Sequence, residues 1–176
     1  MNEQVIAYCE RTDFTFWSEP LNAVSNASFL IAAAIVAWRL RGSGLWLAWA
    51  MVAVLVAIGT GSFLWHTFAT RWAGLSDVLP ILVFILLYVF AATRDYVGLP
   101  WWGAAGAVVL FFPWAIGFSW SVAQVFPQAG ANGAYGSVAV LIVLYALFLR
   151  RTRPEIARGL LIGAGILAVS LGFRML

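Results

Sequence analysis

The stretch that decides the fold is LWLAWAMVAVLVAIGTGSFLWHTF, residues 45–68, in which His66 is the only ionisable side chain. A helix needs about 20 mostly apolar residues to cross the hydrocarbon core of a bilayer, and this stretch is long enough. The composition of the whole chain is also that of a membrane protein, because 64% of the 176 residues are hydrophobic and only 10% are charged. A soluble domain would carry about 25% charged residues. The sequence therefore predicts a membrane protein.

Five further stretches have a similar length and apolar character. Together with Leu45–Phe68 they predict an all-α fold, a polytopic membrane helix bundle with six transmembrane helices. Residues 1–176 are expected to form a single membrane domain, with residues 1–19 as an outer acidic N-terminal segment and residues 20–176 as the six helices. The five further spans are Pro20–Arg39, Leu75–Thr93, Pro100–Phe118, Ala131–Leu149 and Ile156–Phe173.

The basic residues, all of them arginine, predict the orientation. Seven arginines fall in connections on one side of the membrane and three on the other, and the side with more arginines normally faces the cytoplasm. The N-terminus is therefore expected outside, and the composition suggests a bacterial inner membrane. The seven are Arg39, Arg41, Arg94, Arg150, Arg151, Arg153 and Arg158, and the three are Arg11, Arg71 and Arg174.

Charge and cysteine content exclude some partners and sites. The net charge is +3, and its arginines lie between apolar segments and not in one patch, so no nucleic-acid partner is expected. Cys9 is the only cysteine, which excludes an intrachain disulfide and a multi-cysteine metal site.

Ser62, His66 and Asp77 stand close together near the expected outer boundary of the membrane. Ser62 and His66 are four residues apart and share a helix face. Each residue also has a structural interpretation: a serine bonded to its own backbone, an interfacial histidine, and an aspartate at a helix start that Ser76 caps. Together they favour a catalytic or metal-binding site, since a neutral imidazole is a good zinc ligand and a nearby carboxylate can orient it or move protons.

A second polar group lies in the N-terminal segment and the start of the first helix. Glu10, Asp13 and Glu19 offer the hard oxygen ligands that calcium prefers, although a merely solvated carboxylate cluster fits the same pattern. Asn22 and Asn26 follow Glu19 on one helix face, where hydrogen bonding between membrane helices is the favoured interpretation.

Two ordered motifs resemble a known family. In "YCE…SEPLNAVSN" the pattern Glu-x-x-Asn-x-x-Ser-Asn falls on Glu19, Asn22, Ser25 and Asn26. In "GSFLWHTFATRWAGLSDVLP" the pattern Ser-x-x-x-His, followed by Asp eleven residues later, falls on Ser62, His66 and Asp77. These motifs resemble the alkaline ceramidases, in the superfamily that includes the adiponectin receptors. They cover about the first half of the chain.

The resemblance implies a seven-helix, zinc-dependent membrane amidase that hydrolyses the N-acyl bond of a ceramide-like lipid to a fatty acid and a long-chain amine. It places the zinc (Zn²⁺) on His66, with Asp77 and Ser62 as the catalytic carboxylate and hydroxyl beside it. It also implies calcium (Ca²⁺) at the N-terminal segment, where Glu10 and Glu19 align directly and Asp13 less well.

The family's other two zinc ligands form a His-x-x-x-His motif in its seventh helix, and these 176 residues hold one histidine. A shortened form of a longer protein is the favoured expectation, and a degenerate member without zinc chemistry is the other. A different class also fits: a non-catalytic, receptor-like or transport bundle whose polar groups only hold helices together.

Overall fold

The chain is all-helical in the computed structural model, which describes residues 1–127 and 132–175. Within these residues the only extended pairing is an isolated bridge between Gln4 and Thr70, and no strand forms. The predicted all-α class is therefore confirmed. The chain divides into two compact units, residues 1–88 and residues 89–176, which are described separately below.

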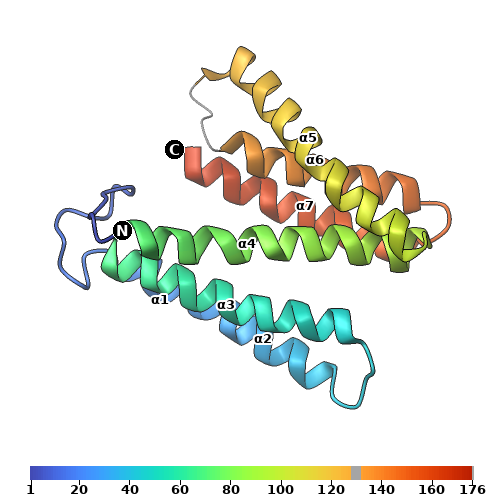
Figure 1. Cartoon of the computed structure of the whole chain (residues 1–176), viewed down its shortest axis with the longest axis horizontal. Helices are drawn as coiled ribbons and strands as arrows, with labels where there is room; N and C mark the ends of the chain where they lie inside the picture. Colours follow the sequence, from blue (N-terminus) through green and yellow to red (C-terminus); the bar gives the residue numbers. More distant parts are fainter. Residues whose placement is uncertain (128–131, 176) are drawn as a thin grey trace. The chain divides into compact units, whose positions relative to one another are not determined.

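The first unit contains three long helical segments after the N-terminal segment (Figure 1). The first is the pair α1 (Pro20–Ser25) and α2 (Ala27–Arg39), which follow each other almost without interruption and together match the predicted span Pro20–Arg39. Helix α3 spans Trp46–Phe68, one residue from the prediction, and packs against α1 and α2. Helix α4 spans Arg71–Ala91, so most of it belongs to this unit.

The second unit begins with the end of α4 and continues into a π-helix, η1 (Ala92–Val97). Three helices follow, in which α6 packs against both α5 and α7. Helix α5 continues past the predicted end at Phe118 by almost two turns, and Ala131, the predicted start of the next span, lies outside the described residues. These helices are α5 (Trp101–Val125), α6 (Asn132–Leu149) and α7 (Pro154–Met175).

The start of α4 corrects the sequence prediction. The helix begins at Arg71 and not at Leu75, so Ser76 is no N-cap: its hydroxyl donates to the carbonyl oxygen of Ala73 at 2.7 Å, inside the helix. Asp77 accordingly lies beyond the first turn. The expected cap is replaced by backbone from the N-terminus, because the N–H groups of Arg71 and Trp72 donate to the carbonyl oxygens of Glu3 and Met1 at 3.1 and 3.2 Å. These bonds satisfy donors that every helix start leaves without an intrahelical partner.

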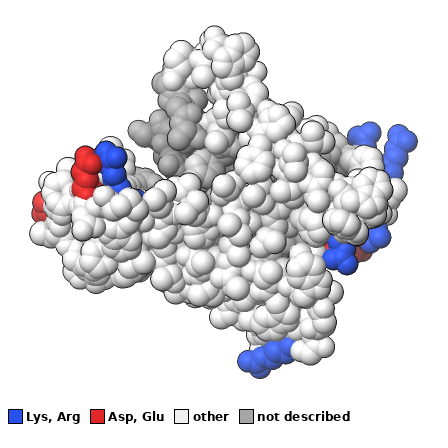
Figure 2. Space-filling model, in the orientation of Figure 1, with Lys and Arg blue, Asp and Glu red and all other residues white. Residues whose placement is uncertain are grey.

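Five helical segments are long and apolar enough to cross a membrane. They are Pro20–Arg39, Trp46–Phe68, Arg71–Val97, Trp101–Val125 and Pro154–Phe173, whereas the apolar part of α6, Gly133–Leu149, is shorter. The surface has the matching character: large apolar side chains are exposed along the helices, and the charged side chains gather toward helix ends and connections (Figure 2). This is the architecture of a multi-pass membrane protein.

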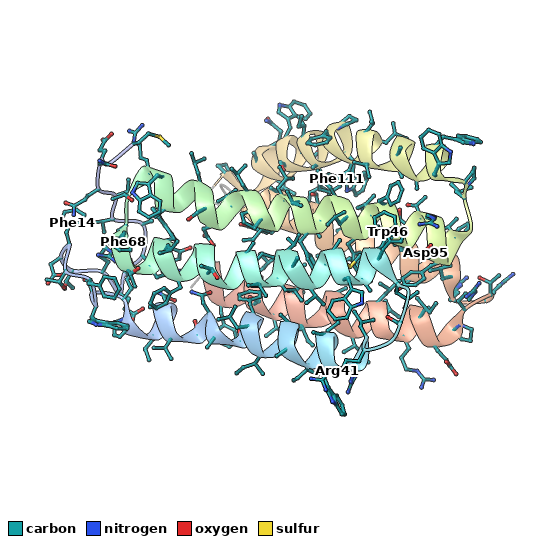
Figure 3. All side chains as sticks on the ribbon, turned by 60° about the horizontal axis from the view of Figure 1, so that its bottom comes forward. Phe14, Arg41, Trp46, Phe68, Asp95 and Phe111 are labelled. Carbon is teal, nitrogen blue, oxygen red and sulfur yellow. The ribbon has the colours of Figure 1, made fainter. Side chains whose placement is uncertain are left out.

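The two ends of the first unit differ in their residues. Phe14 and Phe68 lie at the end that carries the N-terminal segment, and Arg41 and Trp46 lie at the other end (Figure 3). Near Phe14, a cluster of aromatic rings holds the N-terminal segment against α3, with Phe16 packed edge-on against Phe63 and Phe68 at centroid distances of 6.2 and 5.4 Å. The polar residues singled out from the sequence belong to this end.

Helices α3 and α4 come into close backbone contact at Gly61. A Cβ atom on this glycine would lie 1.8 Å from the carbonyl oxygen of Ser76, far inside van der Waals contact. The connection between the two helices is only Ala69 and Thr70, and Ala69 adopts the left-handed conformation with φ of 47°. The short connection and the glycine contact together hold the first turns of α4 against the end of α3.

We expect Gly61→Val to destabilise the protein by about 1 to 3 kcal/mol or more, because the added side chain must push the α4 backbone away. The measurement is the free energy of unfolding in detergent micelles. Gly106→Val is the matched control, since nothing lies within 4 Å of a Cβ at Gly106. Equal stability of the two variants would contradict the close crossing.

Candidate functional site

Three buried ionisable side chains meet at the C-terminal end of α3: Arg11, Glu19 and His66. Glu19 stands immediately before α1, and its two carboxylate oxygens are shared between two partners. Oε1 accepts a bond from Nε of Arg11, and Oε2 lies against Nδ1 of His66, each at 2.5 Å. All three residues are less than one-tenth exposed. We call this group the N-terminal clasp, because it joins the N-terminal segment to the end of α3.

The guanidinium of Arg11 has oxygen acceptors on several sides. Besides Glu19, its Nη1 donates to the backbone carbonyl oxygens of Asp13 and Thr15 at 3.0 and 3.3 Å, and its Nη2 donates to the carbonyl oxygen of His66 at 2.8 Å. The His66 carbonyl belongs to the last turn of α3, where carbonyls lack helical partners and carry partial negative charge. A single buried cation thus neutralises Glu19, orders the loop and caps a helix end.

The imidazole of His66 is held in one orientation. Its Nδ1 is committed to Glu19, and the ring of Tyr8 packs against it with centroids 4.9 Å apart. A carboxylate on one ring nitrogen of a neutral histidine fixes its tautomer and ring orientation. The arrangement therefore leaves Nε2 as the ring nitrogen for a metal ion.

Ser62 lies one turn before His66 on α3, and both residues are buried. Asp77 is half-buried on α4, next in sequence to Ser76, which contacts Gly61. The predicted trio is thus distributed over two helices that touch at this point. Among the described residues, however, no hydrogen bond or ion pair joins Asp77 to Ser62 or His66.

The three carboxylates predicted to bind calcium each bond to the protein itself. Glu10 accepts the backbone N–H groups of Leu21 and Asn22 at 2.8 and 3.2 Å, and so caps the start of α1. Asp13 accepts both the N–H and the hydroxyl of Thr15, and these bonds hold the pKa of the exposed Asp13 carboxyl below its ordinary value. Glu19 belongs to the clasp. Calcium binding by Glu10, Asp13 and Glu19 stays a prediction.

A zinc site needs more ligands than this region supplies. Catalytic zinc takes three protein ligands and a water, and the chain has one histidine and one cysteine. No group of three or more His, Cys, Asp and Glu side chains in residues 1–127 and 132–175 is arranged to hold a metal ion. Cys9 is exposed and free. His66 fits the role of one zinc ligand, but the described residues do not by themselves make up a catalytic zinc site.

Sequence reasoning missed the role of Arg11, which it counted only as an outer charge. It also selected Glu19 and His66 for two different metals, although they bond to each other. A signal for Arg11 was present: it is the only basic residue of the N-terminal segment and lies between Glu10 and Asp13. No local pattern connects Glu19 to a histidine 47 residues away.

We expect Glu19→Gln to destabilise the folded protein by about 3 to 5 kcal/mol, because the change leaves the guanidinium of Arg11 buried without a counter-charge. Chemical unfolding in micelles measures this loss. Glu3→Gln is the matched control: Glu3 pairs with Arg71 at 2.8 Å with both side chains more than three-fifths exposed, and such pairs contribute about 0 to 1 kcal/mol. A Glu19→Gln variant as stable as Glu3→Gln would contradict the importance of the clasp.

No protein-family model, curated protein or solved structure matches this chain. The resemblance to the alkaline ceramidases therefore depends on the two sequence motifs alone. Proteins with many different activities share a helical membrane architecture. The architecture therefore does not identify the function of this protein, and the chemistry of the site is the better guide.

Proposed function

We propose that this protein is a membrane amidase that hydrolyses the N-acyl bond of a ceramide-like lipid, releasing a fatty acid and a long-chain amine. The observation that carries the proposal is the buried pair of Glu19 and His66 at the end of a membrane-spanning helix, one turn from the buried Ser62. Buried ionisable groups at membrane helices are costly and usually serve a function. The substrate would come from the bilayer that surrounds the helices.

Each residue of the predicted trio has a role in this proposal. Asp77 accepts the proton of the attacking water and passes it to the leaving amine, as a general base and acid does. Ser62 donates a hydrogen bond to the oxygen of the carbonyl as negative charge develops there. His66, oriented by Glu19, presents Nε2 toward the reacting groups.

Zinc and calcium belong to the proposal as the ions that the sequence motifs imply. The zinc would take Nε2 of His66, which is the one histidine among the 176 residues. Calcium would bind at the N-terminal segment through Glu10, Asp13 and Glu19, in exchange for bonds that these carboxylates make in the structure.

The proposed topology has six membrane crossings, with α6 as the shortest, and an external N-terminus in a bacterial inner membrane. Seven arginines lie in or beside the α2–α3 connection, η1 and the α6–α7 connection, and their excess over Arg11, Arg71 and Arg174 supports this orientation. The clasp and the predicted trio would then lie near the outer surface.

The second candidate function is a non-catalytic membrane helix bundle, receptor-like or transporting. One observation favours it: the charges of Arg11 and Glu19 compensate each other, and the Arg11 guanidinium also bonds the carbonyl oxygen of His66, so the cluster is satisfied without substrate or metal. In that case the polar groups stabilise the packing and carry no chemistry. The amidase requires Asp77 as a proton acceptor, whereas the non-catalytic bundle does not require it.

Amide hydrolysis by the protein expressed in full from its gene tests the proposal. We expect Asp77→Asn to lower the rate of cleavage of a fluorescent ceramide by about 10² or more, since it removes the proton acceptor. Ser62→Ala should lower kcat by a similar factor, because an oxyanion donor is lost. Asp95→Asn is the control, because Asp95 is an exposed carboxylate in η1, outside the predicted trio.

Asp77→Asn suits this test because the clasp does not include Asp77, so folding and activity can be read separately. Full cleavage by Asp77→Asn at normal expression would reject the mechanism. A wild-type protein that is folded, cleaves no lipid amide and contains no zinc after purification would favour the non-catalytic bundle.

A further inference from the structure

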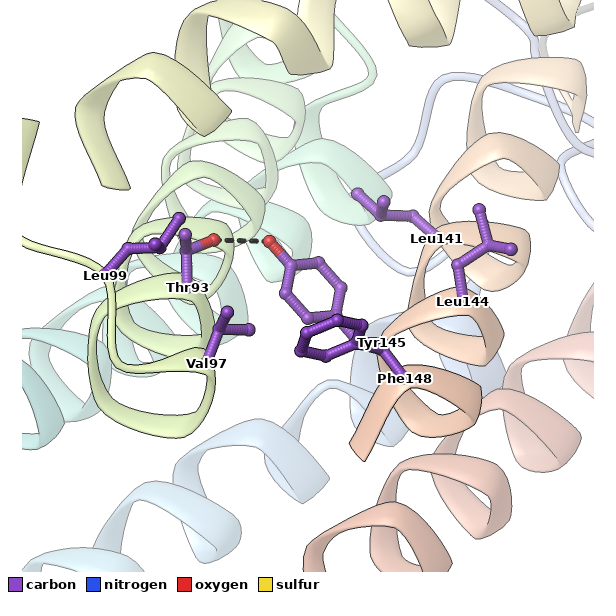
Figure 4. A pocket seen from close by; sticks show the side chains of 7 residues that line it. All are labelled: Thr93, Val97, Leu99, Leu141, Leu144, Tyr145 and Phe148. Carbon is purple, nitrogen blue, oxygen red and sulfur yellow. Dashed lines mark hydrogen bonds between the residues drawn. The ribbon is translucent and has the colours of Figure 1, made fainter. Parts of the chain in front are cut away.

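An apolar pocket of about 300 Å³ lies in the second unit, between η1 and α6 (Figure 4). Val97 and Leu99 form one wall, and Leu144 and Phe148 form the other. Its size is at the lower end of the range for ligand pockets in proteins, about 300 to 1,000 Å³. The π-helix η1 forms part of the lining, and π-helical turns inside α-helices frequently occur at functional sites.

A second apolar pocket, of about 230 Å³, continues along α6. It shares Leu141 and Tyr145 with the first pocket and is lined on its other side by Leu110, Phe111 and Trp114 of α5. The two apolar pockets thus adjoin each other on either side of Leu141 and Tyr145. Apolar walls of this kind fit a hydrocarbon chain.

The polar atoms in the wall of the first pocket satisfy each other. The hydroxyl of Thr93 donates to the carbonyl oxygen of Val89 at 2.7 Å, and it also bonds the hydroxyl of Tyr145. The dashed line in Figure 4 marks this second bond. A polar small molecule would find little to bind here, whereas an acyl chain needs only apolar walls.

The turn that follows α6 is basic. Arg150 follows the lining residue Phe148 by two positions, about 3 Å along the helix axis, and opens an exposed turn that also contains Arg151 and Arg153. None of these three arginines forms an ion pair with another described residue. Arg94, exposed beside Thr93, has Asp95 at 3.7 Å, and Glu155 lies in the first turn of α7, two residues after Arg153.

We propose that this pocket binds an anionic glycerophospholipid of the bilayer, with an acyl chain along α6 and the phosphate at Arg150 and Arg151. The occupant follows from three features: the surrounding solvent is lipid, the adjoining pockets are apolar, and the turn after α6 carries exposed arginines without ion pairs to described residues. Basic groups between membrane helices bind anionic headgroups in this way. The site is independent of the clasp and of the proposed amidase.

Native mass spectrometry of the full chain, released from detergent with equal amounts of phosphatidylglycerol and phosphatidylcholine, tests the proposal. We expect the wild-type protein to retain phosphatidylglycerol preferentially. The triple variant Arg150→Gln, Arg151→Gln, Arg153→Gln should lose that preference by about tenfold or more, given about 1 kcal/mol for each arginine near an anionic surface. Leu144→Trp should lower the retention of both lipids, because the indole fills the pocket.

The chain offers a matched control for each change. Arg39→Gln with Arg41→Gln removes basic charge from the α2–α3 connection, and Leu147→Trp adds an indole on α6 at a residue that does not line the pocket. Leu144 and Leu147 are 46% and 48% exposed, so the two tryptophan variants change the lipid-facing surface alike. Equal retention of the two lipids by the wild-type protein, or unchanged preference in the triple variant, would overturn the proposal.

Discussion

The first unit depends on one buried charge interaction, in which Glu19 lies between the guanidinium of Arg11 and the imidazole of His66. Removing charges from water costs several kcal/mol for each ion, and their attraction offsets that cost only when further hydrogen bonds complete the geometry. Arg11 meets this condition through three backbone carbonyl oxygens. Neither the arginine nor the glutamate can therefore be removed without leaving an uncompensated charge next to a membrane helix.

The N-terminal segment has no helix of its own, but it binds the ends of three helices. Arg11 bonds the last turn of α3, the neighbouring Glu10 caps the first N–H groups of α1, and the carbonyl oxygens of Met1 and Glu3 receive the first N–H groups of α4. Helix ends leave donors and acceptors unpaired, and near lipid these groups find few water molecules. One segment thus satisfies three helix ends, and the clasp holds it in place.

Much of the fold could be predicted from the sequence because bilayer thickness fixes the length of an apolar helix. The span Leu45–Phe68 agrees with α3 to within one residue. The predicted start of α4 was wrong because the cap of this helix is the backbone of Met1 and Glu3, which lie far away in sequence, and no local pattern encodes it. The sequence marked His66 and Glu19 as unusual, but it could not predict their pairing, because the two residues lie far apart in sequence. It also did not show that Arg11 would pair with the same carboxylate.

A structural role explains some of the polar residues at this site, but it does not explain Asp77. The clasp accounts for Glu19 and His66 as stabilising residues, because each is bonded within the protein. It does not account for Asp77, a half-buried carboxylate on a membrane-spanning helix that forms no ion pair with any described residue. Ionisable groups on membrane-spanning helices cost free energy and usually serve a function. Asp77, one residue from the Gly61 contact, is therefore the side chain whose removal best separates the proposed amidase from a non-catalytic bundle.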